Sequence, residues 1–138
     1  MKKDFKLIAL DMDGTLLDDD SNFSKKTALK LKELIDKGIH LVFATGRTHR
    51  SAERVMKKMG ISIPIIAHNG AKATDPLVGE LYNNKMSLED ARKMLGHADE
   101  HNLYAKAYID NLMYIKEADR TSLQFAKDHG LEYKVVGK

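Results

Sequence analysis

Short apolar runs alternate with longer amphipathic stretches through the first half of the chain. The runs predict strands at residues 6–10, 39–44 and 63–67, and the stretches between them predict helices at residues 24–37 and 49–59. Each predicted strand is short and mostly apolar, which is typical of a parallel strand covered by helices on both faces. The alternation predicts an α/β fold built on an open parallel sheet.

The second half of the chain has a different pattern, which is typical of an α+β unit. A turn is predicted at residues 73–76, and a capping box at residues 87–90 predicts the start of a helix. The remaining predicted elements are a hairpin at residues 104–116, a helix at residues 119–129 and a strand at residues 133–136. The expected inner face of the first of these helices consists of Leu88, Ala91, Met94, Leu95 and Ala98. We therefore expect two domains, at residues 1–71 and 72–138.

Polar clusters follow all three predicted strands of the first half. Residues 11–15 follow the first strand, residues 45–47 the second and residues 68–70 the third. Ligands of open α/β sheets bind beyond the carboxyl ends of the strands. These three clusters therefore form the candidate site.

The two carboxylates after the first strand suit phosphoryl transfer. Asp11 is the candidate nucleophile, because a carboxylate can attack phosphorus in line and form an aspartyl-phosphate that water then opens. Asp13 is the candidate general acid and base, a role that requires a pKa raised toward neutrality. Asp11 and Asp13 are also the candidate ligands of a Mg²⁺ ion, which would neutralise the phosphoryl oxygens.

Further residues of the three clusters are candidate contacts of a phosphorylated substrate. Backbone N–H groups after Asp11, with Gly14 permitting close approach, and the hydroxyl of Thr45 are suited to phosphate. The predicted phosphate-binding residues are Met12, Gly14, Thr45 and Gly46, and the predicted substrate-adjacent residues are Arg47 and Asn69. For Arg47, a contact with substrate and a pair with an acid at the start of its helix are equally compatible with the sequence.

These segments resemble the motifs of a known family. Residues 11–17, 44–47 and 69–71 are similar to those of the haloacid dehalogenase superfamily of phosphatases, in particular its Cof-type branch with an α/β cap inserted after the third strand. The resemblance implies a Rossmann-like three-layer core and Mg²⁺-dependent hydrolysis of small phosphorylated metabolites, such as sugar phosphates, through an aspartyl-phosphate. It also implies that the main-chain carbonyl of Asp13, rather than its side chain, faces the metal.

The family pattern also requires two features that residues 72–138 lack. These are a Lys on a later core helix and an acidic Gly-Asp segment that completes the metal site. We therefore expect the chain to be the N-terminal part of a longer phosphatase, with an incomplete cap and little or no activity alone. Two alternatives stay open, a catalytically silent fragment and a regulatory phosphate-binding module with a phospho-acceptor. The latter would carry its acceptor at the end of the third strand, where this chain has His68-Asn69-Gly70.

Composition narrows the range of partners. Lys and Arg total 23 against 20 Asp and Glu, and the net charge of +3 is spread along the chain, so we expect no nucleic acid partner. No apolar run approaches the length of a membrane span and the N-terminus lacks a secretory signal, so we expect no membrane partner and a cytoplasmic location. The absence of cysteine leaves oxygen and imidazole as metal ligands.

Two further expectations concern the surface. His97 and His101 have the i, i+4 spacing of one helix face, and we expect a surface pair rather than a metal site because the sequence shows no third ligand. A sheet with so few strands should leave an uncovered edge through which copies of the chain associate. The side chains expected to be exposed there include Val42, Ile65 and Ile66.

Overall fold

The computed structural model describes residues 5–137 and divides the chain into two compact units, Met1–Asn84 and Lys85–Lys138. Each unit has its own sheet and its own hydrophobic core. Residues 1–4, on which the expectation of no secretory signal partly rests, lie outside the described residues. No helix within the described range is long and apolar enough to cross a membrane.

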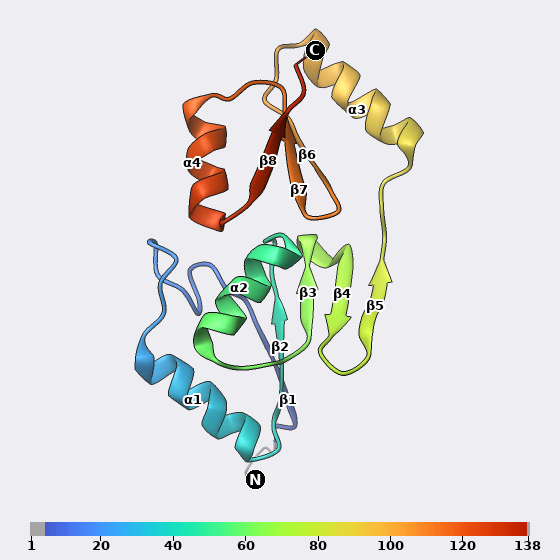
Figure 1. Cartoon of the computed structure of the whole chain (residues 1–138). Coiled ribbons are helices and arrows are strands. Elements are labelled where there is room, and N and C mark those ends of the chain that lie inside the picture. Colours follow the sequence, from blue (N-terminus) through green and yellow to red (C-terminus); the bar gives the residue numbers. More distant parts are fainter. Residues whose placement is uncertain (1–4, 138) are drawn as a thin grey trace. The chain divides into compact units, whose positions relative to one another are not determined.

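The first unit is built on a five-stranded sheet with the order β1-β2-β3-β4-β5 (Figure 1). β1, β2 and β3 are parallel, as predicted, and β4 and β5 continue the sheet as antiparallel strands. The elements are β1 (Leu7–Leu10), α1 (Lys25–Asp36), β2 (His40–Ala44), α2 (His49–Met59), β3 (Ile65–Ala67), the short 3-10 helix η1 (His68–Gly70), β4 (Lys72–Asp75) and β5 (Gly79–Asn83). The mixed α/β fold is therefore confirmed.

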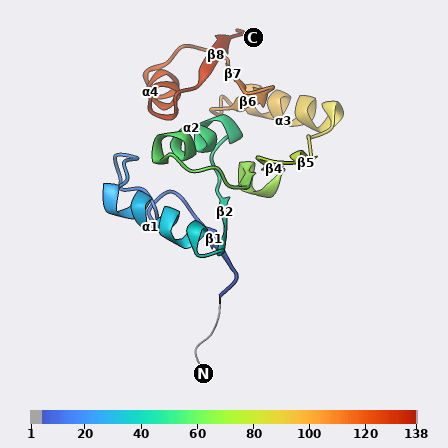
Figure 2. The same cartoon turned by 60° about the horizontal axis from the view of Figure 1, so that its bottom comes forward.

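Both helices of the first unit pack on the same face of its sheet (Figures 1 and 2). They share one core with Leu41 and Phe43, which are two residues apart on β2 and so point to the same face. The parallel strands are neighbours in chain order, and right-handed crossovers in one direction place both connecting helices on one side. The second helical layer of the expected three-layer core is therefore not formed within residues 5–137.

Local residues set the ends of the two helices. The Oγ of Ser24 accepts the backbone N–H of Thr27 at 3.0 Å and caps α1, as predicted. Thr48 caps α2 in the same way by accepting the N–H of Ser51 at 3.3 Å. Gly60 follows α2 with φ 65°, a left-handed conformation in which a glycine avoids the strain of a Cβ atom. The bounds of α2 are consequently those that the sequence predicts.

The turn predicted at residues 73–76 is wrong, because most of that segment lies in β4. The turn follows the strand instead. The carboxylate of Asp75 accepts the backbone N–H of Leu77 at 2.7 Å and that of Val78 at 3.2 Å, and so stabilises the reversal into β5.

The hairpin of β4 and β5 also moves the predicted division between the two halves. Because β4 pairs with β3 and β5 pairs with β4, the first compact unit extends to Asn84 rather than to residue 71. β4 pairs with the edge of β3, and the side chain of Ile65 packs in the core of the first unit. Ile65 is only 2% exposed, so its predicted exposure is wrong. Val42 and Ile66 are half-buried. The outer strands of this sheet are β1 and β5, and association of copies through such an edge stays a prediction.

The second unit contains a three-stranded sheet with the order β6-β7-β8. β6 and β7 form the predicted hairpin, and β8 runs parallel to β7 after a helical crossover. The elements are α3 (Leu88–Glu100), β6 (Lys106–Ile109), β7 (Leu112–Ile115), α4 (Arg120–His129) and β8 (Glu132–Val135). Met113 and Ile115 of β7 pack with Ala126 of α4 in the core of this unit.

The predicted inner face of α3 is wrong. α3 begins after the expected N-cap Ser87, but no described residue of the helix is buried. Leu88 is 67% exposed and Met94 60% exposed, and only the small side chains of Ala91 and Ala98 are half-buried. The apolar stripe identifies the face of α3 that can be buried, and within the described chain no layer covers it.

We expect Phe43→Ala to lower the free energy of unfolding of the first unit by about 3–5 kcal/mol, because it removes a fully buried ring and leaves a cavity. Urea unfolding followed by circular dichroism measures the change. Leu29→Ala, at an exposed position of α1, is the control and should change the stability by less than about 0.5 kcal/mol. A loss for Phe43→Ala no larger than that of the control would contradict the assignment of the core.

Candidate active site

A tight loop carries both candidate carboxylates directly after β1. The carbonyl of Met12 accepts the backbone N–H groups of Leu16 at 3.0 Å and Leu17 at 2.8 Å. The side chain of Met12 is fully buried in the first core. The loop is therefore anchored at Met12, and the residues on either side, Asp11 and Asp13, are exposed.

The bend of this loop depends on Gly14. Its φ is 71°, a left-handed conformation that costs glycine little and strains most other residues. The space that a Cβ atom would occupy is open, so the backbone conformation rather than crowding explains the glycine.

Arg47 joins the end of β2 to the same loop. Its Nε donates to Oδ2 of Asp13 at 2.8 Å, and its Nη2 donates to Oδ1 at 2.5 Å. Nη2 also donates to the Oγ of Ser21 at 2.7 Å, and Nη1 donates to the Oγ of Ser51 at 3.3 Å. The side chain of Arg47 is 4% exposed and that of Asp13 is 55% exposed. Asp13 therefore supplies the countercharge that a buried guanidinium requires.

The ends of β2 and β3 are hydrogen-bonded to each other. The N–H of Asn69 donates to the carbonyl of Thr45 at 3.2 Å, and the N–H of His68 donates to that of Arg47 at 2.9 Å. Thr45 is buried, and its Oγ1 accepts the N–H of Arg47 at 3.1 Å while its own O–H is still able to donate. A Cβ at Gly46 would lie 2.8 Å from Oδ1 of Asn69, so glycine permits this close approach.

The structure brings every predicted site residue to one edge of the sheet. Asp11 to Gly14 follow β1, Thr45 to Arg47 follow β2, and Asn69 lies in η1 directly after β3. Neighbouring parallel strands place these ends side by side. Because the side chain of Met12 points into the core, only its backbone can contact a phosphate.

A Mg²⁺ ion fits this edge through one carboxylate and the substrate. Both oxygens of Asp13 accept hydrogen bonds from Arg47, so Asp11 presents the carboxylate suited to a cation. Mg²⁺ is commonly bound by one or two carboxylates together with phosphate oxygens and water. Over residues 5–137, the one group of three acidic or His side chains with clustered ligand atoms lies elsewhere, on α3.

Two half-buried histidines lie beside the site. Nε2 of His68 accepts the backbone N–H of His49 at 3.3 Å, and Nε2 of His49 lies 2.7 Å from Oγ1 of Thr74. Burial, a charge on His49 and the charge of Lys72 lower the pKa of His68. Burial and the charge of Lys72 lower the pKa of His49. Since a ring nitrogen that accepts a hydrogen bond carries no proton, the geometry also favours neutral His68.

The sequence alone did not indicate Ser21 and Ser51, which accept hydrogen bonds from Arg47, or Thr74, which contacts His49 beside the site. Ser51 lies in the first turn of α2, four residues after Arg47, and this short separation along the chain is a signal of the contact. Ser21 and Thr74 give no such signal, because a loop and the unpredicted strand β4 place them.

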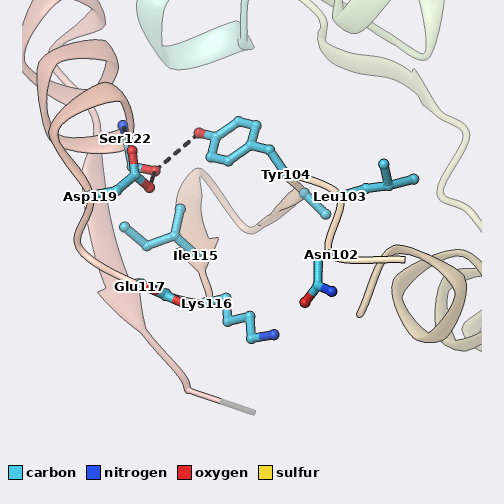
Figure 3. A pocket seen from close by; sticks show the side chains of 9 residues that line it. Asn102, Leu103, Tyr104, Ile115, Lys116, Glu117, Asp119 and Ser122 are labelled. Carbon is cyan, nitrogen blue, oxygen red and sulfur yellow. Dashed lines mark hydrogen bonds between the residues drawn. The ribbon is translucent and has the colours of Figure 1, made fainter. Parts of the chain in front are cut away.

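The second unit has a pocket of about 240 Å³ beside α4 (Figure 3). The Oγ of Ser122 lies 2.5 Å from Oδ2 of Asp119 and 3.1 Å from the hydroxyl oxygen of Tyr104. Oδ1 of Asp119 accepts the backbone N–H of Ser122 at 3.0 Å, and these bonds from Ser122 lower the pKa of Asp119. Asp119 is therefore the N-cap of α4, and its contacts explain its position without a catalytic role.

Comparison with known proteins agrees with this architecture. The family described as haloacid dehalogenase-like hydrolase matches residues 8–136. The chain belongs to this family. Phosphatase YwpJ of Bacillus subtilis is 31% identical over 124 residues, or 89% of the chain. The 5-amino-6-(5-phospho-D-ribitylamino)uracil phosphatase YitU of the same organism is 32% identical over 100 residues, or 71% of the chain.

Solved structures show the same fold. The crystal structure of a haloacid dehalogenase-like hydrolase from Bacteroides thetaiotaomicron superposes with a TM-score of 0.86 over 98% of the chain, at 20% identity. This haloacid dehalogenase-like chain spans 53% of that protein, 43% of YwpJ and 37% of YitU. The family resemblance of the motifs is confirmed, and the activity of a whole protein that contains the chain is a matter for proposal.

We expect the stability of the first unit to fall as the pH drops below 6.5, the ordinary pKa of His49 and His68. Both pKa values are lowered in the folded state, so the unfolded chain binds more protons in the window beneath 6.5, and acid favours unfolding. The midpoint of urea unfolding, measured at several values between about pH 7.5 and 5, gives the slope of stability against pH.

The variant His68→Gln should flatten this slope relative to the parent chain, because it removes one of the two titrating rings. His40→Gln, which replaces an exposed imidazole of β2, is the control and should keep the parent slope. Equal slopes of stability against pH for the parent chain and His68→Gln would contradict a lowered pKa of His68 in the folded state.

Proposed function

We propose that this chain carries the nucleophile and the phosphate-binding residues of a Mg²⁺-dependent phosphatase for small phosphorylated metabolites, such as sugar phosphates. The observation that carries the proposal is the loop after β1, in which exposed Asp11 and Asp13 flank a buried anchor and Asp13 is held by buried Arg47. Family membership and the phosphatase names of YwpJ and YitU support it.

Asp11 is the proposed nucleophile. Its exposed carboxylate stands at the edge where the parallel strands end, so a phosphate ester can approach it from solvent. One carboxylate oxygen forms a bond to phosphorus as the bond from phosphorus to the alkoxide oxygen of the ester breaks. Attack by water on phosphorus then releases inorganic phosphate and restores the carboxylate.

Asp13 is the proposed general acid and base, and Arg47 is its positioning residue. Arg47 fixes both oxygens of Asp13, and a guanidinium favours the ionised carboxylate. That state suits proton removal from the attacking water. Proton donation to the departing oxygen requires a protonated Asp13 with at least one oxygen turned away from Arg47. The proton that Asp13 then takes from the attacking water restores this protonated state.

The phosphate is proposed to lie against backbone and hydroxyl groups of the three strand ends. The N–H groups of Leu16 and Leu17 already donate to the carbonyl of Met12, so the donors proposed for phosphate are those of Met12 and Gly14. The hydroxyl of Thr45 and the backbone of Gly46 complete this set, with Asn69 next to the substrate. When bound, Mg²⁺ would neutralise the phosphoryl oxygens, held by the carboxylate of Asp11 and the main-chain carbonyl of Asp13.

A regulatory phospho-acceptor is a weaker candidate for this chain. A receiver-like domain would carry its acceptor aspartate at the end of the third parallel strand. Here β3 is followed by His68–Gly70, and the acids follow β1. This placement favours the phosphatase.

The test uses beryllofluoride, which mimics the phosphoryl group of an aspartyl-phosphate. With Mg²⁺ present, we expect amide NMR shifts at residues 11–17 and 45–47 of the 138-residue chain. Asp11→Asn should weaken binding by at least about tenfold, because the amide cannot replace the charged oxygen that coordinates beryllium. This readout does not depend on turnover.

Asp36→Asn, which replaces an exposed acid at the end of α1, is the matched control and should keep the parent affinity. The proposal is contradicted if the shifts persist unchanged in Asp11→Asn, or if they arise away from the ends of β1 and β2.

A further inference from the structure

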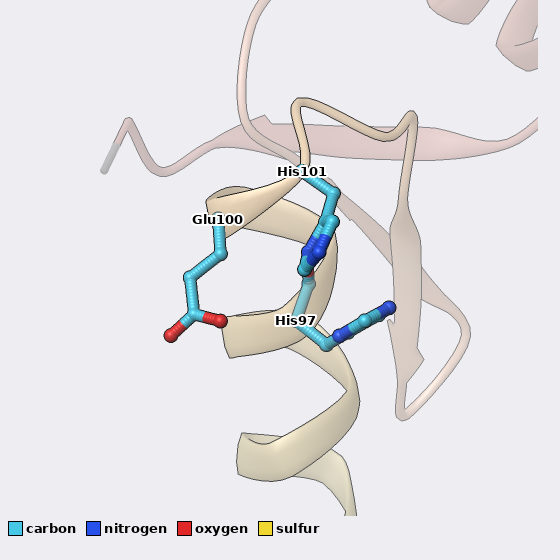
Figure 4. A group of neighbouring side chains, drawn as sticks. All are labelled: His97, Glu100 and His101. Atoms are coloured by element: carbon cyan, nitrogen blue, oxygen red, sulfur yellow. The ribbon is translucent and has the colours of Figure 1, made fainter.

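The last turn and the C-cap of α3 gather three side chains that can ligate a metal. His97, Glu100 and His101 are all exposed and stand at positions i, i+3 and i+4, which share one side of a helix (Figure 4). One ligand atom from each lies within 4.8 Å of the others. The third ligand that the sequence analysis did not find is therefore Glu100.

We propose that His97, Glu100 and His101 form a binding site for a divalent transition metal of the Zn²⁺ class. This site is separate from the proposed phosphatase site and does not depend on it. Two imidazoles and one carboxylate are a ligand set typical of zinc, whereas Mg²⁺ prefers an all-oxygen set. The ligands therefore select a different ion from the one proposed at Asp11.

A hydrogen bond to the helix backbone fixes the tautomer of the His101 ring. Its Nδ1 lies 3.0 Å from the carbonyl oxygen of His97. A carbonyl only accepts, so Nδ1 is the donor and the neutral ring has its free lone pair on Nε2. Metal-binding histidines commonly donate their second nitrogen to a carbonyl in this way, which fixes the tautomer and the ring direction.

The spacing permits closure around one ion. Ligand atoms at 2.0–2.1 Å from a tetrahedral Zn²⁺ lie about 3.4 Å apart, so any pair in this group needs to approach by at most about 1.4 Å. Exposed side chains can make this movement by changes of rotamer. The ring centroids of His97 and His101 are already 4.1 Å apart. The fourth ligand position is left for water or for a group from a partner.

The position of the site on α3 adds two favourable effects. The carbonyl end of a helix attracts positive charge, and His101 is the C-cap of α3. α3 also has no buried residue among those described, so its stability owes little to core packing. A metal that joins positions in the last turn should therefore stabilise the helix measurably.

The test is calorimetric titration of the full chain with Zn²⁺ in a buffer free of chelators. We expect one ion per chain, with affinity reduced at least about tenfold in His97→Gln and in His101→Gln, and less in Glu100→Gln. Zn²⁺ should also raise the thermal midpoint of the parent chain more than that of His97→Gln. Excess Mg²⁺ should not compete.

His40→Gln, which removes an exposed imidazole from the first unit, is the control and should keep the parent affinity. Circular dichroism checks that His97→Gln retains its helix content. The proposal is overturned if the parent chain does not bind Zn²⁺, if His97→Gln and His101→Gln bind as tightly as the parent, or if Asp11→Asn abolishes binding.

Discussion

The geometry of the candidate site depends on the ion pair between Arg47 and Asp13. The two residues are 34 positions apart in sequence, at the ends of neighbouring strands. Arg47 is almost fully removed from water, and its lost hydration is replaced by Asp13 and by the hydroxyls of Ser21 and Ser51. Movement of the loop after β1 would leave a buried guanidinium without its countercharge, so the pair restrains that loop.

The topology of the first unit explains why the ion pair between Arg47 and Asp13 lies at the edge of the sheet that carries the candidate site. Parallel strands end at one edge, and the core anchors the chain there through Met12, which leaves the carboxylates on either side exposed. The same chain order places α1 and α2 on a single face. Among residues 5–137, the helices that pack against this sheet therefore lie on one of its faces.

Local and repeating signals explain most of what the sequence predicts correctly. α2 has both a capping residue and a glycine stop, so its bounds were predictable from its own residues. β4 was not predictable, because Lys72–Asp75 mixes polar and small residues with no clear period. The face of α3 failed for a different reason, since an amphipathic pattern identifies an apolar side but does not show that a partner covers it.

The residues of the candidate site also divide into those that the sequence predicts and those that it does not. The residues at the strand ends were predictable, because open α/β sheets bind ligands there. The partner of Arg47 was not, because several acids were within plausible reach and the choice depends on the bend at Gly14. The contribution of Glu100 to the group on α3 required the positions of side chains, since many helices carry such a spacing without clustered ligand atoms.

A double-mutant cycle in urea with Asp13→Ala, Arg47→Ala and the double variant tests most directly whether the ion pair holds the loop after β1. We expect a coupling energy of about 1–3 kcal/mol between Asp13 and Arg47, which is less than that of a fully buried pair because Asp13 is 55% exposed. Additive losses of stability, with a coupling energy within about 0.3 kcal/mol of zero, would show that the ion pair does not hold the loop.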